Sequence, residues 1–157
     1  MKEIILIPLD GSELAEAVIP FVEDCLCRLA PDVQREVILL HVLHTKDEPY
    51  PTARGRALTP SVSVEEMQSQ VDHATEYLNK VGELLRNTGA KVQVKVVFGE
   101  PVEEIIKIAS EVGARMIAIS THGRSGIRRW ALGSVADKVL RHEKSIPVLV
   151  LKPHMEI

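Results

Sequence analysis

The stretch Ile4-Ile-Leu-Ile-Pro-Leu-Asp-Gly-Ser12 decides how this chain folds. Its apolar run is short enough for a strand buried on both faces, which we expect over residues 2–10. Gly11 and Ser12 then break the run, and either Asp10 or Ser12 can cap a following helix. The stretch therefore predicts a buried strand, a tight turn and a helix in immediate succession.

The residues after this turn have the period of an amphipathic helix. Pro20 interrupts the pattern and should kink the helix, because proline lacks a backbone donor, and Pro31 ends it. Apolar residues at spacings of three and four form one stripe: Leu14, Val18, Phe21, Val22, Cys25, Leu26 and Leu29.

The alternation of strand and helix continues to the end of the chain. Further strands are expected at 37–43, 91–98, 115–120 and 146–152. The segment 91–98 alternates polar and apolar residues and carries outward lysines, which indicates an edge strand. Helices are expected from Val64 to a stop at Gly89, from Pro101 to a stop at Gly113, and from near Gly133. The longest shows the apolar series Val64, Met67, Val71, Ala74, Leu78, Val81 and Leu85.

Strands that alternate with helices favour an α/β fold, a parallel sheet covered by helices on both faces. We expect one domain over residues 1–157, since neither a repeat nor a composition change divides the chain. The polar segment 44–63 contains Pro49, Pro51, Gly55 and Pro60 and is unusually long for a loop in a compact domain. It is expected to be a flexible loop that acts as a lid or an interaction surface.

Composition excludes several classes of protein. The chain has 157 residues, 45% hydrophobic and 26% charged, as is typical of a soluble globular domain. Its net charge of -3 gives no field that favours nucleic acid or an anionic membrane. No apolar run approaches the ~20 residues of a spanning helix, and the N-terminal run fits a strand better than a signal peptide. Cys25 and Cys27 lie on different helix faces and are expected to be reduced thiols in a cytoplasmic protein.

The segment Ser120-Thr-His-Gly-Arg-Ser-Gly-Ile-Arg-Arg-Trp-Ala-Leu-Gly-Ser134 follows the fourth expected strand. Ligands of open α/β sheets bind beyond the carboxyl ends of strands, so this segment is well placed to meet one. Gly133-Ser134 precedes a helical pattern, and a helix N-terminus favours a phosphate. Arg124, Arg128 and Arg129 add positive charge. An anion site is one reading, and a glycine-rich turn beside a basic helix face is the other.

The same segment resembles the nucleotide loop of the universal stress protein family. ATP-binding members of that family carry Gly, two residues, Gly, nine residues, then Gly-Ser or Gly-Thr. Here nine residues separate Gly123 from Gly133-Ser134, while Ser120 stands at the first glycine position, a departure from the pattern. The resemblance extends over the chain through Asp10, Leu40-His41-Val42 and Ile146-Pro147.

The resemblance implies a three-layer α/β/α, Rossmann-like fold with a five-stranded parallel sheet of order 3-2-1-4-5. It implies that ATP, AMP or ADP, with or without Mg, lies across strands one and four. Asp10 and Val42 should lie near adenine and ribose, with Pro8 and Leu9 lining the base pocket. The expected phosphate-binding positions, with their neighbours in the loop, are Ser120, Thr121, His122, Gly123, Arg124, Gly126, Gly133, Ser134 and Val135.

The family resemblance also implies a regulatory protein of the stress response that forms a homodimer through the closing strand, residues 147–151. A slow ATP hydrolase or phosphotransferase, and a dimeric scaffold without nucleotide, remain alternatives. Intact Gly133-Ser134 argues against the scaffold. The sequence shows no general-base pair and no metal cluster, which argues against the enzyme. His41 and His44 are expected to be core or loop residues, because their spacing does not converge on one face of a strand.

Other nucleotide motifs do not match. The chain contains no GxxxxGK[ST] loop, and no GxGxxG follows its first strand. Ser120 leaves two alternatives open: the site tolerates its side chain in place of glycine, or its hydroxyl bonds the ligand.

Overall fold

The computed structural model describes residues 2–28, 33–44, 63–121 and 133–152. Strands and helices alternate along these ranges in the predicted order. The elements are β1 (Lys2–Pro8), α1 (Glu13–Glu16), α2 (Val18–Cys27), β2 (Gln34–Leu43), α3 (Val64–Arg86), β3 (Lys91–Phe98), α4 (Pro101–Val112), β4 (Met116–Ser120), α5 (Ser134–His142) and β5 (Val148–Leu151).

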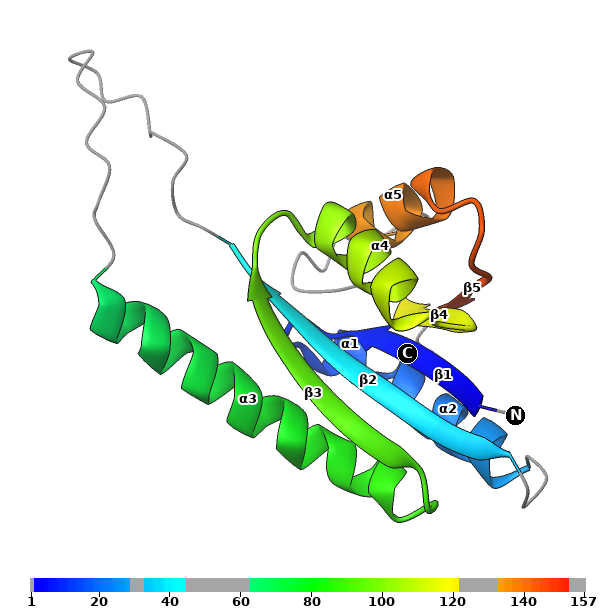
Figure 1. The fold of residues 1–157 in the computed structure, drawn as a ribbon. Helices are drawn as coiled ribbons and strands as arrows, with labels where there is room; N and C mark the ends of the chain where they lie inside the picture. Colours follow the sequence, from blue (N-terminus) through cyan, green and yellow to red (C-terminus); the bar gives the residue numbers. More distant parts are fainter. Residues whose placement is uncertain (1, 29–32, 45–62, 122–132, 153–157) are drawn as a thin grey trace, which may run out of the picture.

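The strands form one parallel sheet of order β3-β2-β1-β4-β5 (Figure 1). In the register of the sheet, Leu6 of β1 lies between Ile38 of β2 and Ile117 of β4. The predicted strand order is therefore confirmed, and so is the prediction that residues 91–98 form an edge strand.

Two apolar cores lie on opposite faces of this sheet. Ile5 and Ile7 of β1 pack toward α1, α2 and α3, while Ile4 and Leu6 pack toward α4 and α5. None of these four side chains is more than 7% exposed. Burial on both faces explains why β1 reads as a continuous apolar run, and the layers make this a three-layer, Rossmann-like α/β/α fold.

The turn after β1 resolves the choice between two caps. Ser12 is the N-cap of α1, and its Oγ accepts a hydrogen bond from the Ala15 backbone N–H at 3.1 Å. The predicted interruption at Pro20 is confirmed: α1 ends at Glu16 and α2 begins at Val18, and Ala17 between them keeps helical backbone angles. Proline cannot donate to the carbonyl four residues earlier and its ring clashes with it. Pro20 therefore lies in the first turn of α2, where a missing donor leaves no bond unmade.

The break also changes which residues the helix buries. The predicted stripe included Phe21, but that side chain is 41% exposed. The buried residues of α2 are instead Val18, Ile19, Val22 and Leu26.

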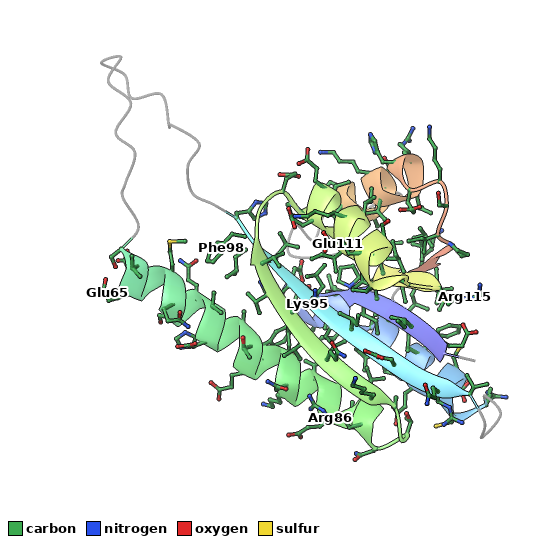
Figure 2. All side chains as sticks on the ribbon, viewed as in Figure 1. Glu65, Arg86, Lys95, Phe98, Glu111 and Arg115 are labelled. Carbon is green, nitrogen blue, oxygen red and sulfur yellow. The ribbon has the colours of Figure 1, made fainter. Side chains whose placement is uncertain are left out.

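Helix α3 is fixed at both ends by its own sequence. Ser63 Oγ accepts from the Glu66 N–H at 3.1 Å, and the Glu66 carboxylate accepts from the Ser63 N–H at 3.0 Å, which forms a capping box. Figure 2 labels Glu65 at the first turn and Arg86 at the last, where their charges suit the helix dipole. Val64 is 78% exposed and Met67 is 36% exposed, and the first buried residue of α3 is Ala74. The apolar stripe therefore begins well before the helix reaches the core.

Two expectations fall largely outside the described ranges. Of the predicted loop 44–63, the structure describes only His44 and Ser63, so its flexibility stays a prediction. The extent of a single domain over residues 1–157 stays a prediction for the same reason. No helix within the described ranges is both long and apolar enough to cross a membrane.

A polar contact joins α3 to α1 on the face of the sheet that these two helices and α2 cover. Tyr77 Oη donates to Glu16 Oε1 at 2.9 Å, although 61 residues separate the two. The Tyr77 ring also meets His41 of β2 edge-on, with ring centroids 6.2 Å apart. Burial is the largest cause that raises the pKa of Tyr77 above its ordinary value, and the hydrogen bond to the Glu16 carboxylate is the next. Folding therefore favours the neutral phenol.

Tyr77→Phe should destabilise the protein at pH 7 by about 0.5–1.5 kcal/mol, the usual net worth of one hydrogen bond. Because the folded-state pKa of Tyr77 is raised, its contribution is complete below the unfolded pKa of about 10 and is lost as pH rises beyond it. Urea unfolding of both proteins between pH 7 and 11 should show the difference in unfolding free energy narrowing above pH 10. The chain's other tyrosine is common to both proteins and cancels. A difference that stays constant across this range would contradict the assignment.

Candidate functional site

A cleft of about 280 Å³ opens at the carboxyl ends of β1, β2 and β4. The chain runs outward from β1 to β2 and β3, then returns to β4 on the other side of β1, so the cleft lies at the topological switch point. Its lining residues are Pro8, Leu9, Asp10, Ala15, Leu40, His41, Val42, His44, Pro101, Ile105, Ile119, Ser120, Thr121, Gly133, Ser134, Val135 and Ala136.

One end of the cleft is apolar. Leu40 and Val42 come from β2, and Pro101 and Ile105 come from the first turns of α4. Leu9 completes this end, and its backbone N–H donates to the Leu40 carbonyl at 2.8 Å, which extends the pairing of β1 and β2 beyond β1. A wall of aliphatic side chains beside a rigid backbone suits a flat, largely apolar ring.

Asp10 is the acidic residue of the lining. Its Oδ1 accepts hydrogen bonds from the Ser12 backbone N–H at 3.0 Å and the Ser12 hydroxyl at 2.6 Å. Since Ser12 also caps α1, one side chain holds both the Asp10 carboxylate and the start of the helix. Gly11 lies between them with φ +83°, a conformation that favours glycine. The turn thus holds a carboxylate at the edge of the cleft in a fixed orientation.

The start of α5 supplies another part of the cleft lining. Gly133 is the N-cap and makes no side-chain cap bond, and the first backbone bond of the helix runs from the Asp137 N–H to the Gly133 carbonyl. The N–H groups of Ser134, Val135 and Ala136 therefore have no partner within the helix. Free donors and the positive end of a helix dipole together favour an anion.

Glycine at position 133 is not required by its backbone conformation. Its φ of -50° and ψ of 143° are ordinary for a residue with a side chain. Serine, threonine or aspartate would cap the helix better, because their oxygens would accept from the free N–H groups. Gly133 leaves those donors uncovered and leaves space in front of them.

Ser120 ends β4 beside the cleft, and Thr121 follows it. Ser120 is 7% exposed and Thr121 is 1% exposed. The Thr121 N–H donates to the Leu151 carbonyl at 2.9 Å, which fixes this backbone against β5. The Ser120 Oγ is buried and has no hydrogen-bond partner among the described residues. A buried hydroxyl in that state is costly, by about 1–3 kcal/mol.

The structure brings most of the predicted site residues together. Those found in the cleft lining are Pro8, Leu9, Asp10, Val42, Ser120, Thr121, Gly133, Ser134 and Val135. The remaining predicted residues lie outside the described ranges: His122, Gly123, Arg124 and Gly126.

Sequence reasoning missed part of the lining. His41 and His44 were not among the predicted site residues, but both line the cleft. Their position at the end of a strand was the signal that could have found them. Pro101 and Ile105 gave no such signal, because only the packing of α4 brings them to β2. Within the described ranges, no group of three His, Cys, Asp or Glu side chains is placed to hold a metal ion.

Comparison with known proteins agrees with this architecture. The model of the universal stress protein family matches residues 1–152. The universal stress protein MJ0577 of Methanocaldococcus jannaschii is 32% identical over 161 residues, covering 97% of this chain and 96% of that protein.

Solved structures have the same fold. The structure of MJ0577 superimposes with a TM-score of 0.79 at 30% identity and covers 98% of both chains. The universal stress protein from Archaeoglobus fulgidus in complex with dAMP gives a TM-score of 0.58 at 24% identity, covering 96% of this chain and 97% of that one. Because the family model spans nearly the whole chain and a relative this similar matches it end to end, the protein belongs to the universal stress protein family.

Proposed function

We propose that this protein binds an adenine nucleotide, ATP or its mono- or diphosphate, in the cleft and acts as a regulatory protein of the stress response. The observation that carries the proposal is the uncapped N-terminus of α5, which faces an otherwise largely apolar cleft at the switch point of the sheet. An apolar pocket with anion donors at one end matches a molecule with a flat base at one end and phosphates at the other.

The cleft orders the parts of such a ligand. The base lies at the apolar end, against Leu9 and Val42. The ribose passes Asp10, whose orientation Ser12 fixes. The phosphates meet the N–H groups after Gly133 and the Ser134 hydroxyl, together with the motif residues Gly123 and Arg124. A Mg ion would accompany a di- or triphosphate through the phosphate oxygens.

Complexes of other family members support the choice of an adenine nucleotide. Universal stress proteins with this fold have been solved in complex with dAMP and in complex with cAMP. Those ligands share adenine, a pentose and a phosphate, which are the parts that the apolar end, the carboxylate turn and the α5 terminus would receive here.

Binding suits the described lining better than hydrolysis does. Its titratable side chains are Asp10, His41 and His44. Asp10 accepts two hydrogen bonds from Ser12, and the ring of His41 packs against the ring of Tyr77. Both side chains therefore make contacts that stabilise the fold. A slow hydrolase or phosphotransferase is therefore the second candidate. A scaffold without ligand is disfavoured, because it would not use the free N–H groups at the start of α5.

The decisive experiment is to denature the purified protein and identify any released nucleotide by chromatography, then to titrate the nucleotide-free protein with ATP, ADP and AMP by calorimetry. An adenine nucleotide in the released fraction, or saturable binding in the titration, supports the proposal. Absence of both would exclude it.

Gly133→Val should abolish measurable binding while the sheet stays folded, since the new side chain occupies the space in front of the α5 donors and the backbone angles suit valine. Ser134→Ala removes one hydrogen bond to a charged group, worth about 1.5–3 kcal/mol. That corresponds to about a ten- to hundredfold loss of affinity. Ser110→Ala, on the exposed side of α4, is the matched control. Calorimetric titration measures the ATP affinity of all three variants. An affinity equal to that of the wild type in Gly133→Val would mean that the nucleotide binds elsewhere.

A homodimer through the closing strand is the remaining part of the proposal. β5 is an edge strand of four apolar, partly buried residues. The carbonyls of Pro147 and Leu151 accept from the N–H groups of Ile117 and Thr121. The backbone groups of Val148 and Val150 therefore face the free edge. An apolar edge of this kind favours pairing with a second copy of the chain across a two-fold axis.

Light scattering at high micromolar concentration should therefore report a dimer. Val150→Pro removes one outward N–H without touching the bonds to β4, so it should shift the protein toward monomer. A monomeric wild type would reject the dimer and leave the nucleotide proposal untouched.

A further inference from the structure

The hydroxyl of Ser120 is buried at the end of β4 without a hydrogen-bond partner in the described ranges. The backbone around it is fixed, because Ser120 pairs with Leu151 of β5 in the sheet register. The residue is only 7% exposed and lines the cleft. A rotation about the single χ1 bond redirects the hydroxyl, so a ligand lying against this residue can meet it without backbone movement.

An unpartnered buried hydroxyl in a native protein needs an explanation, because glycine or alanine at the same place would avoid the cost. The ATP-binding family pattern has glycine at this position, so the hydroxyl is a feature of this chain rather than of the pattern. The neighbouring Thr121 is also buried, but that residue has a further interaction partner. A ligand group that bonds the hydroxyl would make its burial favourable in the complex.

The place of Ser120 in the cleft indicates which part of the ligand it contacts. The pairing of β1 with β4 ends at Leu6 and Ile117, and beyond it Leu9 and Asp10 after β1 and Ser120 of β4 line the same cleft. In the sheet order, β2 with Leu40 and Val42 lies on the far side of β1 from β4, whereas α5 follows β4 and packs beside β5. Ser120 and Asp10 thus stand between the base end and the phosphate end, where the sugar of a nucleotide passes.

We propose that the Ser120 hydroxyl hydrogen-bonds a hydroxyl group of the nucleotide's ribose and so selects ribonucleotides over their deoxy forms. The inference rests on the proposed nucleotide site and adds to it a specificity-determining residue. Serine suits this role because its hydroxyl both donates and accepts, as a sugar hydroxyl does.

Ser120→Ala separates this role from a structural one, because it should move two properties in opposite directions. Removing the unpartnered oxygen should raise the melting temperature of the nucleotide-free protein, by about 2–4 °C if it relieves about 1 kcal/mol. The same change should weaken ATP binding about five- to tenfold, the loss expected for one hydrogen bond. Ser110→Ala, with an exposed hydroxyl, should change neither. Loss of stability together with loss of affinity would overturn the proposal in favour of a structural role.

Deoxy analogues of ATP then test the partner group. Calorimetric titration of wild type and Ser120→Ala with ATP, 2′-deoxy-ATP and 3′-deoxy-ATP should show that the penalty of the substitution disappears for one deoxy analogue. An equal penalty for all three ligands would assign the bond to the base or phosphates and overturn the sugar assignment. If wild type binds no adenine nucleotide, the proposed function itself fails. If wild type and Ser120→Ala bind ATP equally, only this inference fails.

Discussion

The pairing of β1 on both edges is the constraint on which the rest of the structure depends. β1 bonds to β2 on one side and to β4 on the other, and its central residues are buried by helices on both faces. Parallel neighbours require crossover connections of one hand, so α1, α2 and α3 cover one face and α4 and α5 the other (Figure 1). The two connections leave β1 and β4 in opposite directions, and the cleft opens where they part.

That constraint explains why the proposed site depends so much on backbone. Strand ends and helix starts converge on the cleft whatever their side chains are, so β1, β2, β4 and the first turns of α1, α4 and α5 all reach it. The anion-binding character of the α5 start follows from the absence of a capping side chain, since Gly133 places no oxygen over the α5 donors. The carboxylate between the two ends is fixed by Ser12, which caps α1 and holds Asp10 with the same hydroxyl group. Local sequence thus sets the chemistry of a position that topology provides.

This division also explains what the sequence could predict. The strands and their alternation with helices were predictable, because each strand is an apolar run between turn residues. Strand order came from the family resemblance, as did the roles given to Pro8 and Val42, whereas Gly133 was already indicated by its place before a helical pattern. Contacts between distant elements gave no local signal: Tyr77 meets Glu16 across 61 residues, and Ile105 reaches the cleft only through the packing of α4. The break at Ala17 was half foreseen, since proline predicts an interruption but not whether the helix bends or restarts.

Specificity in a site of this kind has to come from its few polar side chains. Backbone N–H groups at a helix start donate hydrogen bonds to any phosphate, and an aliphatic wall discriminates only weakly between flat rings. A buried group that needs a partner discriminates far more, because a ligand without that partner leaves it unsatisfied. Ser120 is such a group: its hydroxyl is already desolvated before the ligand arrives, so little further desolvation offsets the bond it makes. A serine that slightly destabilises the empty protein can therefore sharpen its choice of ligand, which glycine at the same position cannot do.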